Sequence, residues 1–212
     1  MNYVTQLDKV RQDKPLLFSY RRCPYAMRAR MSLLSCGVDF DIFEISLKNK
    51  PHQMIEISPK GTVPVFVYRD VVLDESIDIM NWATQQKNNN SIKINPHDLP
   101  IINSMIKIND GEFKNKLDLY KYTSNKEVYL KTKYRKECEV YIKNIDERLE
   151  KQEYLLSNKF GYLDIAIFPF IRQFFNVELK WVEEASYINL KKWVERISIS
   201  DIFTQIMKKP ET

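Results

Sequence analysis

The sequence predicts a mixed α/β domain followed by an all-helical domain. Up to Gln86, short apolar runs typical of strands alternate with helical patterns, whereas beyond Asp98 only helical periodicity remains. Residues 87–98 between the two parts are polar, rich in asparagine and broken by a proline, which is typical of a linker or an exposed loop. We therefore expect an N-terminal domain over residues 15–86 and a helical domain over residues 99–212.

The composition is that of an ordinary globular protein. Of the 212 residues, 44% are hydrophobic and 29% are charged, which is enough apolar material for a substantial core. The net charge of +5 is modest and the lysines are dispersed, so the sequence does not require a nucleic-acid partner. The polar segment Met1–Lys14 lacks the apolar core of a signal peptide, and the most apolar run, Ile165–Phe175, contains Arg172 and is too short to span a membrane. We expect a soluble, cytoplasmic protein without a membrane partner.

The N-terminal domain can be read element by element. Residues 15–20 are a short apolar strand, and a helical pattern of apolar residues then continues to Gly37, a residue suited to a helix C-terminus. The following pattern predicts a half-buried strand over 38–45, a short helix over 52–57, a hairpin of strands over 63–68 and 71–73, and a helix from Ile77. This βαβαββα order is that of a thioredoxin-like domain.

The second domain shows only helical patterns. Apolar residues from Leu99 to Leu117 suggest one long helix, weakened by ~1 kcal/mol at Gly111. Ser124 and Glu127 form a capping box that predicts the start of the next helix at Ser124, with Cys138 on its apolar face. Three further helical patterns follow, over residues 162–174, 190–197 and 202–207.

Cys23 lies where the first strand passes into the first helix, and Pro24 follows it directly. The N-terminus of a helix favours negative charge, and four arginines are near in sequence: Arg21, Arg22, Arg28 and Arg30. Such surroundings lower a cysteine pKa from ~8.5 to ~3.5–7.5. We therefore expect a reactive thiolate at Cys23. The alternative is a buried cysteine that packs as a small hydrophobic side chain.

The other two cysteines predict neither a disulfide nor a metal site. Cys36 is 13 residues beyond Cys23, and this separation along one helix corresponds to roughly 20 Å, which is too far for a disulfide. Cys36 and Cys138 are expected to be packing residues. Neither the cysteines nor His52 and His97 have metal-ligand spacing, so we expect no metal, and the sparse cysteines suit a reducing compartment.

Several motifs resemble those of the omega-class glutathione transferases. In chain order they are Cys23-Pro24-Tyr25-Ala26, Leu47-Lys48-Asn49-Lys50-Pro51, Val63-Pro64-Val65, Glu75-Ser76, and Asp164 with Pro169. The resemblance covers nearly the whole chain. It implies the two-domain transferase fold, a homodimer with facing active sites, and glutathione as cosubstrate. In that class a cysteine forms a mixed disulfide with glutathione, which implies thiol transfer to small disulfides, glutathionylated adducts or dehydroascorbate more than conjugation to an electrophile.

The same resemblance assigns roles to individual residues. Cys23 corresponds to the catalytic cysteine, and Pro64 to a cis-proline that exposes the backbone of Val63 to the cysteinyl part of glutathione. Glu75 and Ser76 correspond to residues that bind the γ-glutamyl ammonium and carboxylate, and Lys50 to a lysine that faces the glycyl end. Each has a plain structural alternative: a trans turn proline, a helix cap and a solvated surface lysine.

The sequence also departs from the family pattern. The Ser or Thr that caps a helix three residues before the aspartate is here Gly161, so Asp164 is expected to stabilise the helix start with less help. Little chain follows Met207, which leaves the second substrate undefined. The motif at Cys23 holds no second cysteine, so glutathione itself must resolve the mixed disulfide.

Two other functions use the same fold. One is a non-enzymatic adaptor of the stringent-starvation-regulator type that binds a protein partner, against which the intact set of glutathione contacts argues. The other is that of the intracellular chloride channel proteins, which share a Cys-Pro motif and insert into membranes. Arg28 and Arg30 in the first helix make insertion costly. The leading hypothesis is therefore a glutathione-dependent thiol transferase.

Overall fold

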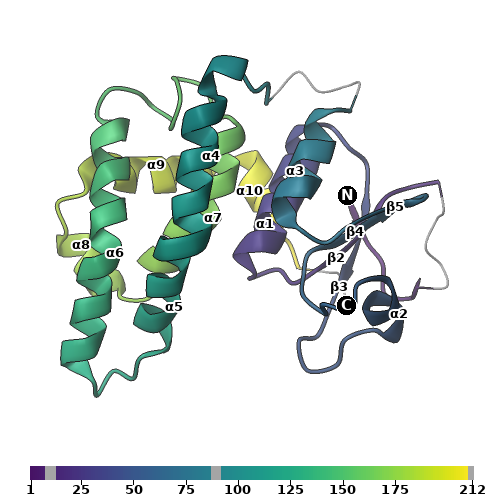
Figure 1. Cartoon of the computed structure of the whole chain (residues 1–212), viewed down its shortest axis with the longest axis horizontal. Helices are drawn as coiled ribbons and strands as arrows, with labels where there is room; N and C mark the ends of the chain where they lie inside the picture. The colour runs from purple at the N-terminus through teal and green to yellow at the C-terminus, as the bar shows by residue number, and fades with distance from the viewer. Residues whose placement is uncertain (8–12, 87–91, 210–212) are drawn as a thin grey trace. The chain divides into compact units, whose positions relative to one another are not determined.

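The computed structural model describes residues 1–7, 13–86 and 92–209 (Figure 1). The chain divides into two compact units, one formed by Met1–Lys93 with Ser200–Thr212 and the other by Ile94–Ile199. The first unit is a sheet covered by helices and the second consists of helices. The predicted fold class, a thioredoxin-like α/β domain followed by a helical domain, is confirmed.

The sheet of the first unit has five strands in the order β1-β3-β2-β4-β5. Strands β1, β2 and β3 are parallel to one another. Strand β4 is antiparallel to β2, and β5 is antiparallel to β4, with which it forms the predicted hairpin. Their bounds are Asn2–Tyr3, Leu16–Ser19, Asp41–Glu44, Val65–Tyr68 and Val71–Leu73. Strand β1 was not predicted, because two residues in a polar segment show no apolar period.

Helices cover both faces of this sheet (Figure 1). Helices α1 (Pro24–Ser35) and α3 (Ser76–Thr84) pack side by side on one face, where Phe66 of β4 stacks on Trp82 with ring centroids 4.6 Å apart. Helix α2 (His52–Ile57) packs on the other through Met54, which joins Leu16 and Phe18 in a buried cluster. Alternate residues of β2 and β4 thus fill two layers of core, as the strand period requires.

Helix α1 begins and ends as its sequence predicts. Cys23 is the N-cap and Pro24 is the first helical residue, where the missing N–H removes no hydrogen bond. At the other end Gly37 has φ of 68° and its N–H donates to the Leu34 carbonyl at 3.0 Å. A glycine adopts this left-handed conformation without steric cost, so the chain can leave α1 and enter β3.

The second unit contains the 3-10 segment η2 and helices α4 to α9. Their bounds are Pro96–Asp98, Leu99–Ile108, Lys114–Tyr122, Val128–Leu149, Tyr162–Phe175, Leu179–Glu184 and Ile188–Ser198. The predicted single helix from Leu99 is interrupted by a π-helical turn, Asn109–Phe113, which contains Gly111 and separates α4 from α5. The partly exposed Gly111 lies in this turn, at the position where the sequence predicts a weakened helix.

The helix predicted to begin at Ser124 begins later, at Val128. The Glu127 carboxylate does accept the Ser124 N–H at 3.3 Å, but Ser124 Oγ accepts from the Lys126 N–H, and the N-cap is Glu127 itself. The Ser and Glu pattern therefore closes a turn ahead of α6. Such motifs locate a helix start only to within a few residues.

Asp164 is buried at the start of α7 and is better supported than the sequence indicates. Its two carboxylate oxygens accept the N–H of Leu155 at 3.0 Å, the N–H of Gly161 at 3.0 Å and the indole N–H of Trp193 at 2.8 Å. Burial raises the pKa of Asp164 to about 6, and these donors oppose the shift. The indole of Trp193, from α9, thus stabilises the Asp164 carboxylate, although it does not replace the acceptor that a side-chain oxygen at position 161 would offer to the helix N–H groups.

The end of the chain groups with the first unit. Helix α10 (Asp201–Ile206), which the sequence assigns to the helical domain of residues 99–212, packs on α1 instead. The Tyr3 hydroxyl donates to the Lys208 carbonyl at 2.9 Å, and Phe203 and Ile206 are buried. A periodic pattern identifies a helix but not its partner, so the domain membership of α10 could not be predicted.

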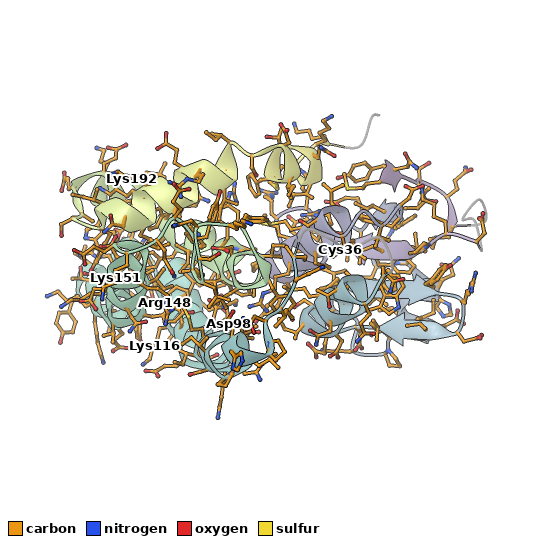
Figure 2. The ribbon with its side chains drawn as sticks, turned by 90° about the horizontal axis from the view of Figure 1, so that it is seen from above. Cys36, Asp98, Lys116, Arg148, Lys151 and Lys192 are labelled. Atoms are coloured by element: carbon orange, nitrogen blue, oxygen red, sulfur yellow. The ribbon has the colours of Figure 1, made fainter. Side chains whose placement is uncertain are left out.

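Cys36 and Cys138 are packing residues, as predicted. Each is 1% exposed, and none of the three cysteines forms a disulfide. Burial raises the pKa of Cys36 to about 11 and that of Cys138 to about 12. Cys36 is labelled in Figure 2. Among the described residues, no helix is long and apolar enough to span a membrane, and no group of three or more His, Cys, Asp or Glu side chains could hold a metal.

Candidate functional site

Cys23 is the partly exposed cysteine of the chain and stands at the N-cap of α1. Its backbone is extended, with φ of −75° and ψ of 125°, and its side chain makes no capping hydrogen bond to the helix. The sulfur therefore lies at the helix start. The Sγ–H donates to the Val63 carbonyl oxygen at 3.7 Å. A thiolate at this position would be stabilised by the positive end of the α1 dipole.

Val63 reaches the thiol from the loop before β4. Its peptide bond to Pro64 is cis, as the resemblance implies. Gly61 precedes this loop in a left-handed conformation, with φ of 63°, and its N–H donates to the Ser58 carbonyl at 3.0 Å. The loop thus brings a main-chain carbonyl to the sulfur and leaves the Val63 side chain half-buried.

The start of α3 holds Glu75 and Ser76, and neither side chain caps the helix. Glu75 is the N-cap residue, but its exposed carboxylate forms an ion pair with Lys60. Ser76 is 3% exposed, and its Oγ accepts a hydrogen bond from the Arg28 guanidinium at 3.4 Å. The first intrahelical N–H donor is that of Ile79, so the helix start presents N–H groups that can bind an anion.

Lys50 is exposed and follows a tight turn closed by the Ser46–Asn49 bridge. Its ammonium lies near Gly61, since a Cβ added there would be 3.9 Å from Nζ. Lys50 therefore belongs to the same end of the first unit as the loop that carries Val63. The structure thus places all the predicted site residues in one unit and shows direct contact between Cys23 and Val63.

The buried arginines of α1 form part of this site in a way the sequence did not reveal. Arg28 and Arg30 were recognised as cations near Cys23, but both side chains are 0% exposed. Arg28 contacts Ser76 and lies 5.6 Å from the Tyr25 ring centroid. Arginine is rarely buried without partners, so the two arginines among the apolar residues of α1 were the available signal.

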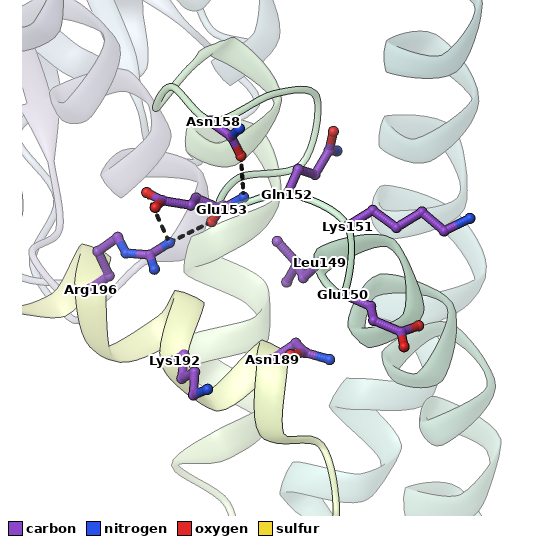
Figure 3. Close-up of a pocket in the computed structure, with 9 residues that line it drawn as sticks. All are labelled: Leu149, Glu150, Lys151, Gln152, Glu153, Asn158, Asn189, Lys192 and Arg196. Atoms are coloured by element: carbon purple, nitrogen blue, oxygen red, sulfur yellow. Dashed lines mark hydrogen bonds and ion pairs between the residues drawn. The ribbon is translucent and has the colours of Figure 1, made fainter.

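Each unit has a surface hollow whose lining does not include the predicted site residues. One of 280 Å³, in the second unit, lies between the end of α6 and α9, where Arg196 points back to Glu153 (Figure 3). Another of 490 Å³, in the first unit, is lined by Cys36 and Trp82 among others. Neither is lined by Cys23, Val63 or Ser76.

Family comparisons match both domains. Residues 17–91 match the family described as glutathione S-transferase, N-terminal domain, and residues 105–201 match glutathione S-transferase, C-terminal domain. A probable glutathione transferase of Aplysia californica is 35% identical over 57 residues, which cover 27% of this chain and 62% of that protein. Glutathione S-transferase omega-1 of Mus musculus is 43% identical over 49 residues, or 23% of this chain and 20% of that protein.

A longer match has a different description. The stringent starvation protein A homolog of Haemophilus influenzae is 23% identical over 199 residues, which cover 89% of this chain and 88% of that protein. Among solved structures, a tau class glutathione S-transferase from mango has a TM-score of 0.80 at 22% identity, covering 94% of each chain. A glutathione transferase from Pseudomonas putida with glutathione disulfide bound has a TM-score of 0.79 at 16% identity, covering 94% of this chain and 93% of that one.

Proposed function

The chain belongs to the glutathione S-transferase superfamily, and from that premise we propose that it is an omega-like thiol transferase that uses glutathione through Cys23. The observation that carries this proposal is the position of Cys23. A partly exposed sulfur at the N-cap of α1 lies where the positive end of the helix dipole stabilises a thiolate. A cysteine at this place supports covalent chemistry at sulfur.

The proposed reaction has two thiol–disulfide exchanges. First, the Cys23 thiolate attacks the glutathionyl sulfur of a mixed disulfide GS–SR, the S–S bond breaks, and RS⁻ leaves and takes a proton from water. Cys23 then holds glutathione as a mixed disulfide. Next, the thiolate of a free glutathione attacks that glutathionyl sulfur, so glutathione disulfide leaves and the Cys23 thiolate is restored. Overall, GS–SR and one glutathione yield RSH and glutathione disulfide.

The resolving thiol comes from glutathione, because Cys36 and Cys138 are unsuited to this role. Both are buried, and burial raises the pKa of each to about 11 and about 12. The small disulfides, glutathionylated adducts and dehydroascorbate that the resemblance implies remain the candidate substrates. A reducing cytoplasm suits this chemistry and three cysteines that form no disulfide.

The proposed glutathione contacts are spread along one end of the first unit. The Val63 main chain would pair with the cysteinyl part, as an added strand would. The N–H groups at the start of α3, with Ser76, would hold the γ-glutamyl carboxylate, and Glu75 would exchange its Lys60 partner for the ligand ammonium. Lys50 would face the glycyl carboxylate. The absence of side-chain caps from Glu75 and Ser76 supports binding over capping.

Activity assays on matched cysteine variants test the proposal. Exchange between a glutathione mixed disulfide and glutathione is compared with chlorodinitrobenzene conjugation in the wild type, Cys23→Ser and Cys36→Ser. We expect Cys23→Ser to abolish exchange while conjugation persists or rises, and Cys36→Ser to retain exchange. Full exchange activity in Cys23→Ser would refute the mechanism.

The second candidate is a protein-binding adaptor of the stringent-starvation type, favoured by the long match to the Haemophilus influenzae protein. An adaptor need not bind glutathione. Titration calorimetry with glutathione therefore distinguishes the two functions, since a transferase requires measurable affinity. No glutathione binding together with no exchange or conjugation would favour the adaptor.

A further inference from the structure

A tight turn presents Cys23 to the start of α1. The Cys23 N–H donates to the Tyr20 carbonyl at 2.9 Å, so Arg21 and Arg22 are the central residues of a four-residue turn. The turn joins β2 to α1, and any change in its conformation moves the sulfur relative to the helix axis. The position of the reactive atom therefore depends on what holds this turn.

One ion pair holds both main-chain polar groups of Arg21. The Arg21 N–H donates to Glu44 Oε1 at 2.6 Å, and the Arg21 carbonyl accepts a hydrogen bond from Arg30 Nη2 at 2.6 Å. Arg30 Nη1 lies 3.8 Å from Glu44 Oε2, so the two side chains close a ring around the Arg21 peptide groups. Hydrogen bonds with a charged partner are about twice as strong as neutral ones.

The fold brings this pair and its partner Ser19 together from three elements. Arg30 lies seven residues beyond Cys23 on α1, which places both on the same face of the helix. Glu44 is the last residue of β3 and is in register with Ser19 of β2, whose Oγ accepts from Arg30 Nη1 at 3.1 Å. The pair thus contacts the turn before Cys23 directly, through the main-chain N–H and carbonyl of Arg21.

Arg30 interacts electrostatically with the titratable groups around it. Arg30 is fully buried, and burial lowers its pKa against the opposing effects of Glu44, Tyr3 and Cys23. Burial also raises the pKa of Glu44, opposed by Arg21 and Arg30. The buried cation therefore interacts with two acidic groups at once, the Glu44 carboxyl and the Cys23 thiol, with Tyr3 of β1 facing the same pair.

We propose that the Arg30–Glu44 ion pair positions the Cys23 thiolate, by holding the turn at Arg21 and by dividing one buried positive charge between Glu44 and the sulfur. Arg30 and Glu44 are thus positioning residues that act through Cys23. This inference rests on the proposed function, since it assumes that the thiolate is the reacting species. Arg30 and Glu44 thus control the charge at the Cys23 sulfur in addition to the helix dipole.

The test is the pH profile of Cys23 alkylation by iodoacetamide, followed by peptide mass mapping in the full chain. Glu44→Gln keeps an oxygen for the Arg21 N–H but leaves Arg30 uncompensated, so the apparent thiol pKa should fall by roughly one unit. Arg30→Met leaves the Glu44 charge unbalanced, so the apparent pKa should rise by roughly one unit. A merely structural role cannot produce shifts of opposite sign.

Two controls keep the test decisive. Arg22→Met removes an exposed cation next to Cys23, and solvent screening should make its shift smaller than that of Arg30→Met. The double variant Arg30→Met with Glu44→Gln leaves no unpaired charge, and its thiol pKa should lie near the wild-type value. If Arg30→Met fails to fold, the difference between Glu44→Gln and the double variant gives the effect of Arg30.

Shifts of the same sign in the two single variants, or no shift in either, would overturn the proposal. Alkylation needs no glutathione, so this result is independent of the exchange assay. Loss of exchange in the wild type with opposite pKa shifts in the variants would refute the proposed function and leave the charge arrangement supported. Normal exchange by the wild type, without pKa shifts in the variants, would support the proposed function and refute the role of Arg30 and Glu44.

Discussion

The structure predicts a large difference in reactivity among the three thiols. Cys23 is partly exposed at the positive end of a helix, whereas Cys36 and Cys138 are each 1% exposed. Burial raises the pKa of Cys36 to about 11 and that of Cys138 to about 12. The difference can be measured by adding oxidised glutathione to the folded protein and following the modification of each thiol.

The magnitude follows from the thiolate fractions at neutral pH. Even with an unshifted pKa of ~8.5, Cys23 would be about 3% thiolate at pH 7, against roughly 0.01% for Cys36 and roughly 0.001% for Cys138. A thiolate of higher pKa is intrinsically more nucleophilic, with a Brønsted slope of about 0.45, which recovers part of this deficit. Cys23 should still react roughly 25-fold faster than Cys36 and roughly 80-fold faster than Cys138. Burial of both slower thiols increases these ratios.

The assay is time-resolved peptide mass mapping after incubation with oxidised glutathione. We expect one early adduct, on the peptide that contains Cys23, and its rate should extend to lower pH than that of an ordinary thiol. Cys23→Ser should remove the early adduct, and Cys36→Ser should leave it unchanged. If Cys36 or Cys138 in the folded wild type were modified as fast as Cys23, the reasoning from charge and burial would be wrong.

Further predictions concern ligand binding, pH and assembly. Ser76→Ala and Glu75→Ala should each weaken glutathione binding by roughly 1–3 kcal/mol in titration calorimetry, because each removes a polar partner of the ligand; unchanged affinity in both would exclude them from the site. The pKa of Asp164 is raised by burial to about 6, so the stability that its protonated form contributes is complete below pH ~4 and is lost as the pH rises through the folded-state pKa. The free energy of unfolding relative to Asp164→Asn, measured in urea, should therefore fall by about 2 kcal/mol between pH 4 and pH 7, and a difference that grows with pH would contradict this. Light scattering should show the dimer that the resemblance implies, and a monomer at micromolar concentration would count against it.

Local signals in the sequence were sufficient where the structure is decided locally. Pro24 after Cys23 and Gly37 at the far end delimit α1 closely, because each residue suits only one end of a helix. The two short strands of the β4–β5 hairpin were likewise predicted from β-branched runs around a turn. These elements position Cys23, so its place at a strand-to-helix junction could be predicted without a structure.

The remaining features depend on partners far away in the sequence. Strand β1 exists because β3 offers it an edge, and α10 belongs to the first unit because it packs on α1. The burial of Arg30 depends on Glu44, which lies on β3, the strand next to β2. Periodicity describes one element at a time, so an ion pair between two elements leaves no trace in it.

Helix α1 by itself explains why one of its two cysteines is suited to chemistry. Cys23 is the N-cap and Cys36 is the C-cap of the same helix, so the two sulfurs experience opposite ends of one macrodipole. The positive end favours a thiolate at Cys23, and the negative end disfavours one at Cys36, where burial acts in the same direction. The buried Arg30 then adds a fixed positive charge on the Cys23 side of the helix. Exchanging the proposed roles of the two thiols would thus require reversing the helix dipole as well as moving an ion pair, so the reactivity proposed for Cys23 depends on the fold as well as on its own side chain.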